Sequence, residues 1–194
     1  RKPSWMKVNL DLNSGYKVLK TTMRELELVT VCEEAGCPNI YECWGQGTAT
    51  FMINGERCTR ACGFCMVDTR LPMPIDIDES LRIAEAVRRM DLKHVVITAV
   101  ARDDLNDGGA SGFVDTINAI RKETSTTRIE VLIPDFKGLK EPLEEVLEAN
   151  PDILNHNLET VARLQRAVRP SAGYGRSLAM LARAKRAGFT TKSG

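Results

Sequence analysis

The sequence predicts an α/β fold built on a parallel sheet, because apolar runs of strand length alternate with helical patterns from about residue 50 onward. Strands that follow one another through helices pair in parallel, by crossover connections. The 194 residues, 43% of them apolar, can bury the core that such a sheet needs. Periodicity alone leaves two architectures open, an open doubly wound sheet and part of a barrel.

Short apolar runs predict the strands at residues 50–53, 94–99, 129–133 and 152–154, and a fifth run begins near Phe189. No G-x-G-x-x-G pattern follows the first run. A dinucleotide-binding fold therefore has no support from the sequence.

Helical periodicity fills the intervals between these runs. The helices are predicted over about residues 79–90, 112–122, 139–148, 158–168 and 177–187. In the first of them, Ile83, Ala84 and Val87 share one face, and Asp76 and Asp78 precede it, where acidic groups favour a helix start. Gly188 is expected to end the last helix in the left-handed conformation.

Charge and hydropathy narrow the function classes. Lys and Arg number 27 against 26 Asp and Glu, and the resulting net charge of +1 argues against a nucleic-acid partner. No apolar run approaches the roughly 18–20 residues that span a bilayer, and residues 1–16 lack the apolar core of a signal peptide. We expect a cytoplasmic protein that does not bind membranes. The start at Arg1 without Met leaves a trimmed organellar leader open.

The six cysteines form two sets of three, and all of them lie within residues 32–65. The first triplet reads C-x4-C-x5-C and comprises Cys32, Cys37 and Cys43. The second triplet reads C-x3-C-x2-C and comprises Cys58, Cys62 and Cys65.

Three kinds of site could use these cysteines. Disulfide frameworks belong to small secreted chains with poor cores, which this chain does not resemble. Structural zinc prefers four Cys or His ligands, whereas each triplet offers three, and His94 and His156 lie far along the chain. Three thiolates suit a cubane iron–sulfur cluster that leaves one iron open to a substrate or cofactor. The spacing therefore predicts two iron–sulfur clusters.

The second triplet, with Phe64 just before its third cysteine, resembles the signature of radical S-adenosylmethionine (SAM) enzymes. The first triplet, in the context of residues 31–39 (VCEEAGCPN), resembles the lipoyl synthase family specifically. The likeness continues through residues 49–53, 100–110, 130–136 and 156–161, so it covers essentially the whole chain.

This resemblance implies a partial, six-stranded (β/α) barrel of the TIM-like, radical SAM type, with the second triplet at the carboxyl end of strand one. Residues 1–48 would form an extension that carries the auxiliary cluster, and residues 49–194 would form the barrel. The family has a late Arg-Ser-Ser-Tyr motif whose serine caps the auxiliary cluster, and this sequence lacks it. We therefore expect a fragment truncated near strand five, able to bind clusters but poor in turnover.

The resemblance also implies the activity. The cluster on the second triplet would donate an electron that cleaves SAM, and the resulting 5′-deoxyadenosyl radical would abstract hydrogen from an octanoyl chain on a lysine. The auxiliary 4Fe–4S cluster would supply two sulfur atoms, to carbons 6 and 8, as in lipoate biosynthesis. The implied partners are the E2 component of a 2-oxoacid dehydrogenase or the glycine cleavage H protein, and reduced ferredoxin or flavodoxin as the electron donor.

The resemblance further implies SAM contacts at seven positions: Phe64, Thr98, Ala99, Val100, Asn157, Glu159 and Arg169. Each position also has an ordinary structural interpretation. Small residues at 98–100 suit the packing of a strand end, and Asn157 with Glu159 would suit the start of a helix. Arg169 could meet a carboxylate or oppose the dipole at the end of its helix.

Two other function classes remain. A tRNA methylthiotransferase is also a radical enzyme with three additional cysteines, but its nucleic-acid partner conflicts with the near-zero net charge. An electron-transfer module would normally use four cysteines per cluster and leave no iron open.

Overall fold

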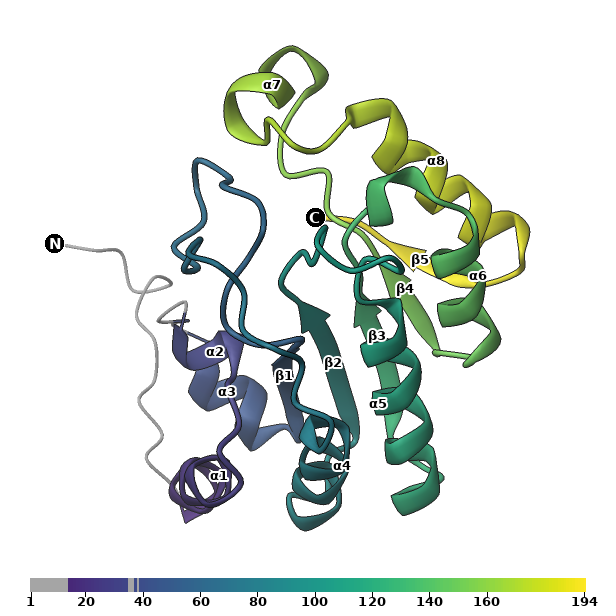
Figure 1. Ribbon diagram of the computed structural model, residues 1–194. Helices are drawn as coiled ribbons and strands as arrows, with labels where there is room; N and C mark the ends of the chain where they lie inside the picture. Colours follow the sequence, from purple (N-terminus) through teal and green to yellow (C-terminus); the bar gives the residue numbers. More distant parts are fainter. Residues whose placement is uncertain (1–13, 35–36, 38) are drawn as a thin grey trace, which may run out of the picture.

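The computed structural model describes residues 14–34, 37 and 39–194. Residues 1–13 of the expected extension, and 35, 36 and 38 of the first cysteine motif, lie outside this part. One parallel sheet forms the centre of the fold, with its strands in sequence order from β1 to β5 (Figure 1). The strands are β1 (Thr48–Ile53), β2 (His94–Ala99), β3 (Arg128–Leu132), β4 (Ile153–Asn155) and β5 (Thr190–Lys192).

Helices connect these strands and confirm the predicted α/β fold. The long helices after the first four strands are α4 (Glu79–Arg89), α5 (Ala110–Glu123), α6 (Glu141–Glu148) and α8 (Tyr174–Arg186). Short 3-10 helices are η2 (Phe136–Gly138) and η3 (Ala162–Leu164), and η3 leads into α7 (Gln165–Val168). Helix α4 packs on α5, and α5 packs on α6. Three further helices lie at the edge of the sheet that β1 forms, opposite β5 (Figure 1): α1 (Ser14–Glu25), α2 (Val31–Glu34) and α3 (Ile40–Gly45).

One row of paired strand residues shows how the core is built. Phe51 pairs with Ile97, Ile97 with Val131, and Val131 with Leu154, and all four are fully buried. Because strand side chains alternate between faces, this row and its neighbours two residues away point toward the helices. Burial of each such side chain contributes about 1.5–3 kcal/mol.

The opposite face of the sheet carries a buried carboxylate. The side chain of Glu130 is 3% exposed and receives hydrogen bonds from Asn155 Nδ2 at 3.0 Å and from Lys192 Nζ at 3.0 Å. His94 Nε2 lies 3.3 Å from its other oxygen. Burial raises the pKa of this carboxyl group, but the contacts with His94, Lys192 and Asn155 outweigh it and bring the pKa to about 2. The carboxylate therefore joins four strands, β2 to β5.

Replacement of Glu130 by glutamine is expected to cost about 2–3 kcal/mol of unfolding free energy at pH 7, because a lowered folded-state pKa stabilises the fold wherever the carboxylate is charged. The contribution is present above the usual value of 4.5 and is lost as the pH falls toward about 2. Denaturant unfolding at a series of pH values measures it, with the exposed Glu148→Gln as control. A constant difference between pH 7 and pH 3 would contradict this account.

The structure corrects one predicted helix. Residues 158–161 are not helical, and the helical turns begin only at Ala162. Glu159 has a left-handed φ of 64°, and the amides of Leu158 and Glu159 both donate to the carbonyl of Gly194. Asn157 caps no helix, since its Oδ1 accepts from the Gly194 amide. The other predicted helices and all five strands are confirmed to within a few residues, and Gly188 ends α8 with a φ of 93°.

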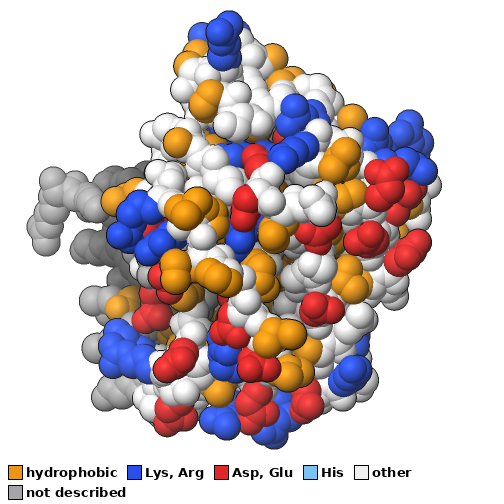
Figure 2. Space-filling view, viewed as in Figure 1, with side chains coloured by type: hydrophobic (Ala, Val, Ile, Leu, Met, Phe, Trp, Pro, Cys, Tyr) orange, Lys and Arg blue, Asp and Glu red, His pale blue; other side chains and the backbone are white. Residues whose placement is uncertain are grey.

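Acidic and basic side chains intermingle over the face shown in Figure 2, in keeping with the balanced charge of the whole chain. Within the described ranges, no helix combines the length and the apolar character needed to cross a membrane.

Candidate functional site

A pocket of about 310 Å³ opens where the carboxyl ends of β1, β2 and β3 meet the loops that follow them. Thr50, Met52, Thr98 and Leu132 form its strand-borne wall. The carboxyl ends of parallel strands share one edge of a sheet, and α/β folds place their chemistry there.

The second cysteine triplet lies in the loop after β1, and Cys58, Cys62 and Cys65 all line this pocket. Backbone hydrogen bonds fix the loop at two points. The amide of Cys58 donates to the carbonyl of Asp68, and the amide of Gly63 donates to that of Val168, each at 2.8 Å. All six cysteines of the chain are free thiols.

Arg169 lies beside one of these thiols. Burial raises the pKa of Cys62, the Arg169 guanidinium opposes this shift, and Cys58 and Cys65 add to it. These interactions show that the three sulfur atoms share one electrostatic environment. Arg169 Nη1 donates to the carbonyl of Asn157 at 2.6 Å, while its Nε is buried and has no hydrogen-bond partner among the described residues.

The seven positions expected to contact SAM all line the same pocket. They come from three regions of the chain: Phe64, Thr98, Ala99, Val100, Asn157, Glu159 and Arg169. Phe64 stands beside the cysteines and is 53% exposed. The Thr98 hydroxyl donates to the carbonyl of Leu132 at 3.1 Å, which joins β2 to β3 at the pocket wall. The structure thus brings these residues together, and their contacts to a cofactor stay a prediction.

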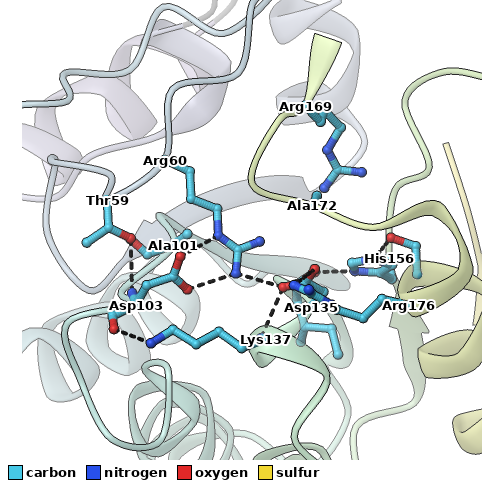
Figure 3. A network of polar contacts seen from close by, with 12 residues as sticks. Thr59, Arg60, Ala101, Asp103, Asp135, Lys137, His156, Arg169, Ala172 and Arg176 are labelled. Carbon is cyan, nitrogen blue, oxygen red and sulfur yellow. Dashed lines mark hydrogen bonds and ion pairs between the residues drawn. The ribbon is translucent and has the colours of Figure 1, made fainter. Parts of the chain in front are cut away.

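Sequence reasoning missed one charged residue of the pocket. Arg60, between Cys58 and Cys62, lines the pocket and forms ion pairs with Asp103 and Asp135 (Figure 3). Its position between two cysteines of the motif was the sequence feature that could have indicated a role at the site. The partners could not be read from the sequence, because they follow β2 and β3 and reach Arg60 only in the folded chain.

The first cysteine triplet lies outside the pocket but next to it. Cys32 is in α2 and Cys43 in α3, and both pack against the hydrophobic core. Burial raises the pKa of Cys43, and charges on Cys32 and Cys37 raise it further. The preceding segment joins β1, since the Met52 amide donates to the Val29 carbonyl and Val31 lines the pocket.

No three His, Cys, Asp or Glu side chains in the described part of the chain converge on a point that could hold a single metal ion. A cubane cluster makes a different demand, because its cysteines ligate a group of several irons. The fit to a cluster therefore rests on the three pocket-lining thiols. The buried, unpartnered Nε of Arg169 beside them offers a donor to an anionic ligand such as a carboxylate.

Comparison with known sequences identifies relatives over the whole chain. The N-terminal domain of lipoyl synthase of the radical SAM family matches residues 1–37, and the Radical SAM superfamily matches residues 52–194. Lipoyl synthase of Rubrobacter xylanophilus is 55% identical, covering 100% of this chain and 61% of that protein. Lipoyl synthase of Geobacillus sp. is 58% identical, covering 95% of this chain and 62% of that protein. The chain thus spans less than two thirds of the length of these relatives.

Solved structures share the fold at low sequence identity. Methylornithine synthase matches with a TM-score of 0.59 and 15% identity, over 96% of this chain and 52% of that one. A maturase of the FeFe-hydrogenase matches with a TM-score of 0.59 and 16% identity, over 94% and 47%. These likenesses agree with a partial TIM-like barrel. With the superfamily match running from β1 to Gly194 and the cysteine loop set into the pocket at its expected strand end, this chain belongs to the radical SAM superfamily.

Proposed function

We propose that the protein is a lipoyl synthase, a radical SAM sulfurtransferase that inserts two sulfur atoms at carbons 6 and 8 of a protein-bound octanoyl chain. The observation that carries this proposal is the pair of cysteine triplets on either side of β1. One triplet lines the pocket, and Cys32 and Cys43 of the other pack on the core next to it. The 55–58% identity to lipoyl synthases along the chain supports the same activity.

The protein's own residues would bind and orient the reacting groups. Cys58, Cys62 and Cys65 would hold one 4Fe–4S cluster and leave one iron for SAM, and Cys32, Cys37 and Cys43 would hold the auxiliary cluster. When bound, these groups supply hydrogen abstraction from unactivated carbon and the sulfur to be inserted.

Other residues that line the pocket would bind and enclose SAM. Arg169 would pair with the carboxylate of SAM through its free Nε, and Asn157 and Glu159 would contact the ribose hydroxyl groups. Phe64, with the strand end at residues 98–100, would enclose the cofactor and exclude water. A carbon radical must meet its sulfur donor at near-attack distance, and Val31, the neighbour of Cys32 in the auxiliary triplet, lines the pocket.

The domain division, partners and compartment follow from this activity. Residues 1–48 would form the extension that carries the auxiliary cluster, and residues 49–194 the barrel. The substrate would be an octanoylated lipoyl-carrier domain, of either the E2 or the H-protein type. Reduced ferredoxin or flavodoxin would donate electrons, and six cysteines that form no disulfide suit the reducing cytoplasm.

Replacement of Arg169 by glutamine is expected to weaken SAM binding by about 10- to 100-fold, the usual effect of losing a hydrogen bond to a charged group. Equilibrium dialysis of the reconstituted protein against labelled SAM measures the affinity. Arg166→Gln is the matched control, because Arg166 is exposed on α7. Equal affinities for the Arg169→Gln and Arg166→Gln proteins would show that Arg169 does not bind the cofactor.

Anaerobic reconstitution with iron and sulfide tests the proposed function. We expect about eight irons per chain, from two 4Fe–4S clusters. With SAM and a reductant, 5′-deoxyadenosine should form faster when an octanoyl-lysyl peptide is added than when the unacylated peptide is added. Tight zinc binding without iron–sulfur absorbance would overturn the proposal. Equal rates of 5′-deoxyadenosine formation with the octanoylated and the unacylated peptide would also overturn it.

A further inference from the structure

Arg60 is the buried cation of the cysteine loop. Its side chain is 5% exposed, although it lies between two cysteines of an otherwise half-buried loop. Nε and Nη2 donate to the two carboxylate oxygens of Asp103 at 2.7 and 2.8 Å, which is the bidentate geometry that arginine favours. Nη2 also lies 2.7 Å from Asp135 Oδ1.

The two carboxylates belong to different strand ends. Asp103 follows β2, and Asp135, which is fully buried, follows β3. Asp135 also pairs with Arg176 of α8 at 3.1 Å and accepts from the amide of Lys137. Figure 3 shows Arg60 reaching from the cysteine loop to both carboxylates, with Arg176 on the far side of Asp135. The charges of these two arginines and two aspartates therefore cancel where the cysteine loop meets the strand ends.

Thr59, the residue before Arg60, also connects the cysteine loop to the residues after β2. The amide and hydroxyl groups of Thr59 both donate to the carbonyl of Ala101, at 3.0 and 2.9 Å. The Thr59 hydroxyl oxygen in turn accepts from the amide of Asp103 at 3.0 Å. The loop is thus fixed to the end of β2 by backbone bonds and to the ends of β2 and β3 by one guanidinium group.

We propose that Arg60 is a positioning residue that holds the second cysteine triplet in one arrangement over the strand ends and, together with Arg176, neutralises Asp103 and Asp135 next to the pocket. This inference rests on the proposed cluster at Cys58, Cys62 and Cys65. Arg60 does not bind iron or substrate. It acts through the loop geometry and through the local charge, both of which affect the reduction potential of a cluster.

Two substitutions separate geometry from charge. Arg60→Gln removes the charge and the bidentate contact, whereas Arg60→Lys keeps the charge and loses the planar fork. Arg70→Gln is the matched control, because it removes one positive charge from the same loop between β1 and α4. The Arg70 side chain is 75% exposed and pairs with Asp68 at the surface.

The first measurement is hydrogen exchange on the cluster-free protein. The amides of Thr59 and Gly63 should exchange at least ~10-fold faster in Arg60→Gln, the scale expected when charge-assisted hydrogen bonds are lost. Arg70→Gln should leave both rates unchanged. Unaltered exchange in Arg60→Gln would overturn the positioning role, and this result requires no cluster.

The second measurement is the electron paramagnetic resonance spectrum and the midpoint potential of the reduced cluster. Both Arg60 variants should give a heterogeneous spectrum. Only Arg60→Gln should lower the potential, since it leaves one uncompensated negative charge. A single unchanged spectrum, or an equal fall in Arg70→Gln, would overturn the proposal. If the unsubstituted chain bound no cluster while Thr59 exchange rose as expected, the proposed function would fail and the loop-positioning role would stand.

Discussion

Replacement of Cys62 by alanine is expected to abolish SAM cleavage and to remove about four irons per chain, the content of one 4Fe–4S cluster. The physical reason is the ligand count, because a triplet has no spare thiolate. Residues that only support a metal ligand typically cost 10- to 100-fold when lost, so the loss of a ligand should exceed about 100-fold. Iron analysis and the rate of 5′-deoxyadenosine formation measure the two effects.

A stability measurement separates this effect from unfolding. Cys62 lies in a loop at the pocket rather than in the hydrophobic core, so the thermal midpoint of the cluster-free protein should stay close to that of the unsubstituted chain. Cys65→Ala tests the same triplet at its exposed member. Full iron content or normal SAM cleavage in both variants would place the cofactor elsewhere.

The sheet was predictable because its pattern is local. Residues 94–99 form a strand with the predicted ends, since alternate side chains meet the helices and the register repeats every two residues. The cysteine spacing was informative for a similar reason. Three thiols within eight residues must share one loop, and the structure places all of them at one pocket.

The failures arose where distant contacts decide the conformation. Residues 158–161 are predicted as the start of a helix, yet Glu159 adopts a left-handed φ and the amides of Leu158 and Glu159 bond to Gly194, more than thirty residues later. Arg60 is similar, because its partner Asp103 lies 43 residues further along the chain. Helices α1, α2 and α3 were not predicted either. Helix α1 has an amphipathic pattern that was available in the sequence, whereas α2 and α3 span only four and six residues and pack against β1.

These long-range contacts also explain how the pocket is assembled. The cysteine loop, the end of β2 and the segment before α7 each contribute to its wall. Thr59 and Arg60 join the first two, and the Gly63 bond to Val168 joins the loop to α7, which follows the third. The pocket is therefore a product of tertiary contacts between loops, although its three cysteines and the seven positions expected to contact SAM could be named from the sequence.

Replacement of Cys43 by alanine is expected to separate the two halves of the reaction. The variant should lose about four irons and at least ~100-fold of whatever sulfur insertion the unsubstituted chain supports. It should still cleave SAM within about threefold of the unsubstituted rate, because effects at separate sites combine almost independently. The two triplets lie on different structural elements, since Cys43 is in α3 and Cys62 is in the loop after β1. Mass spectrometry of the octanoyl-lysyl peptide measures sulfur insertion, and 5′-deoxyadenosine measures cleavage.

The Cys43→Ala and Cys62→Ala proteins are each other's controls, since each should lose the same iron content but a different step. Cys43 and Cys32 both pack against the core, so Cys37→Ala provides the second variant of the first triplet. A loss of function shared by Cys43→Ala and Cys37→Ala cannot be ascribed to core packing at α3 alone. Sulfur insertion that persisted in both variants would mean that the sulfur comes from another source. Loss of SAM cleavage in both, with folding intact, would mean that the two triplets build one site rather than two.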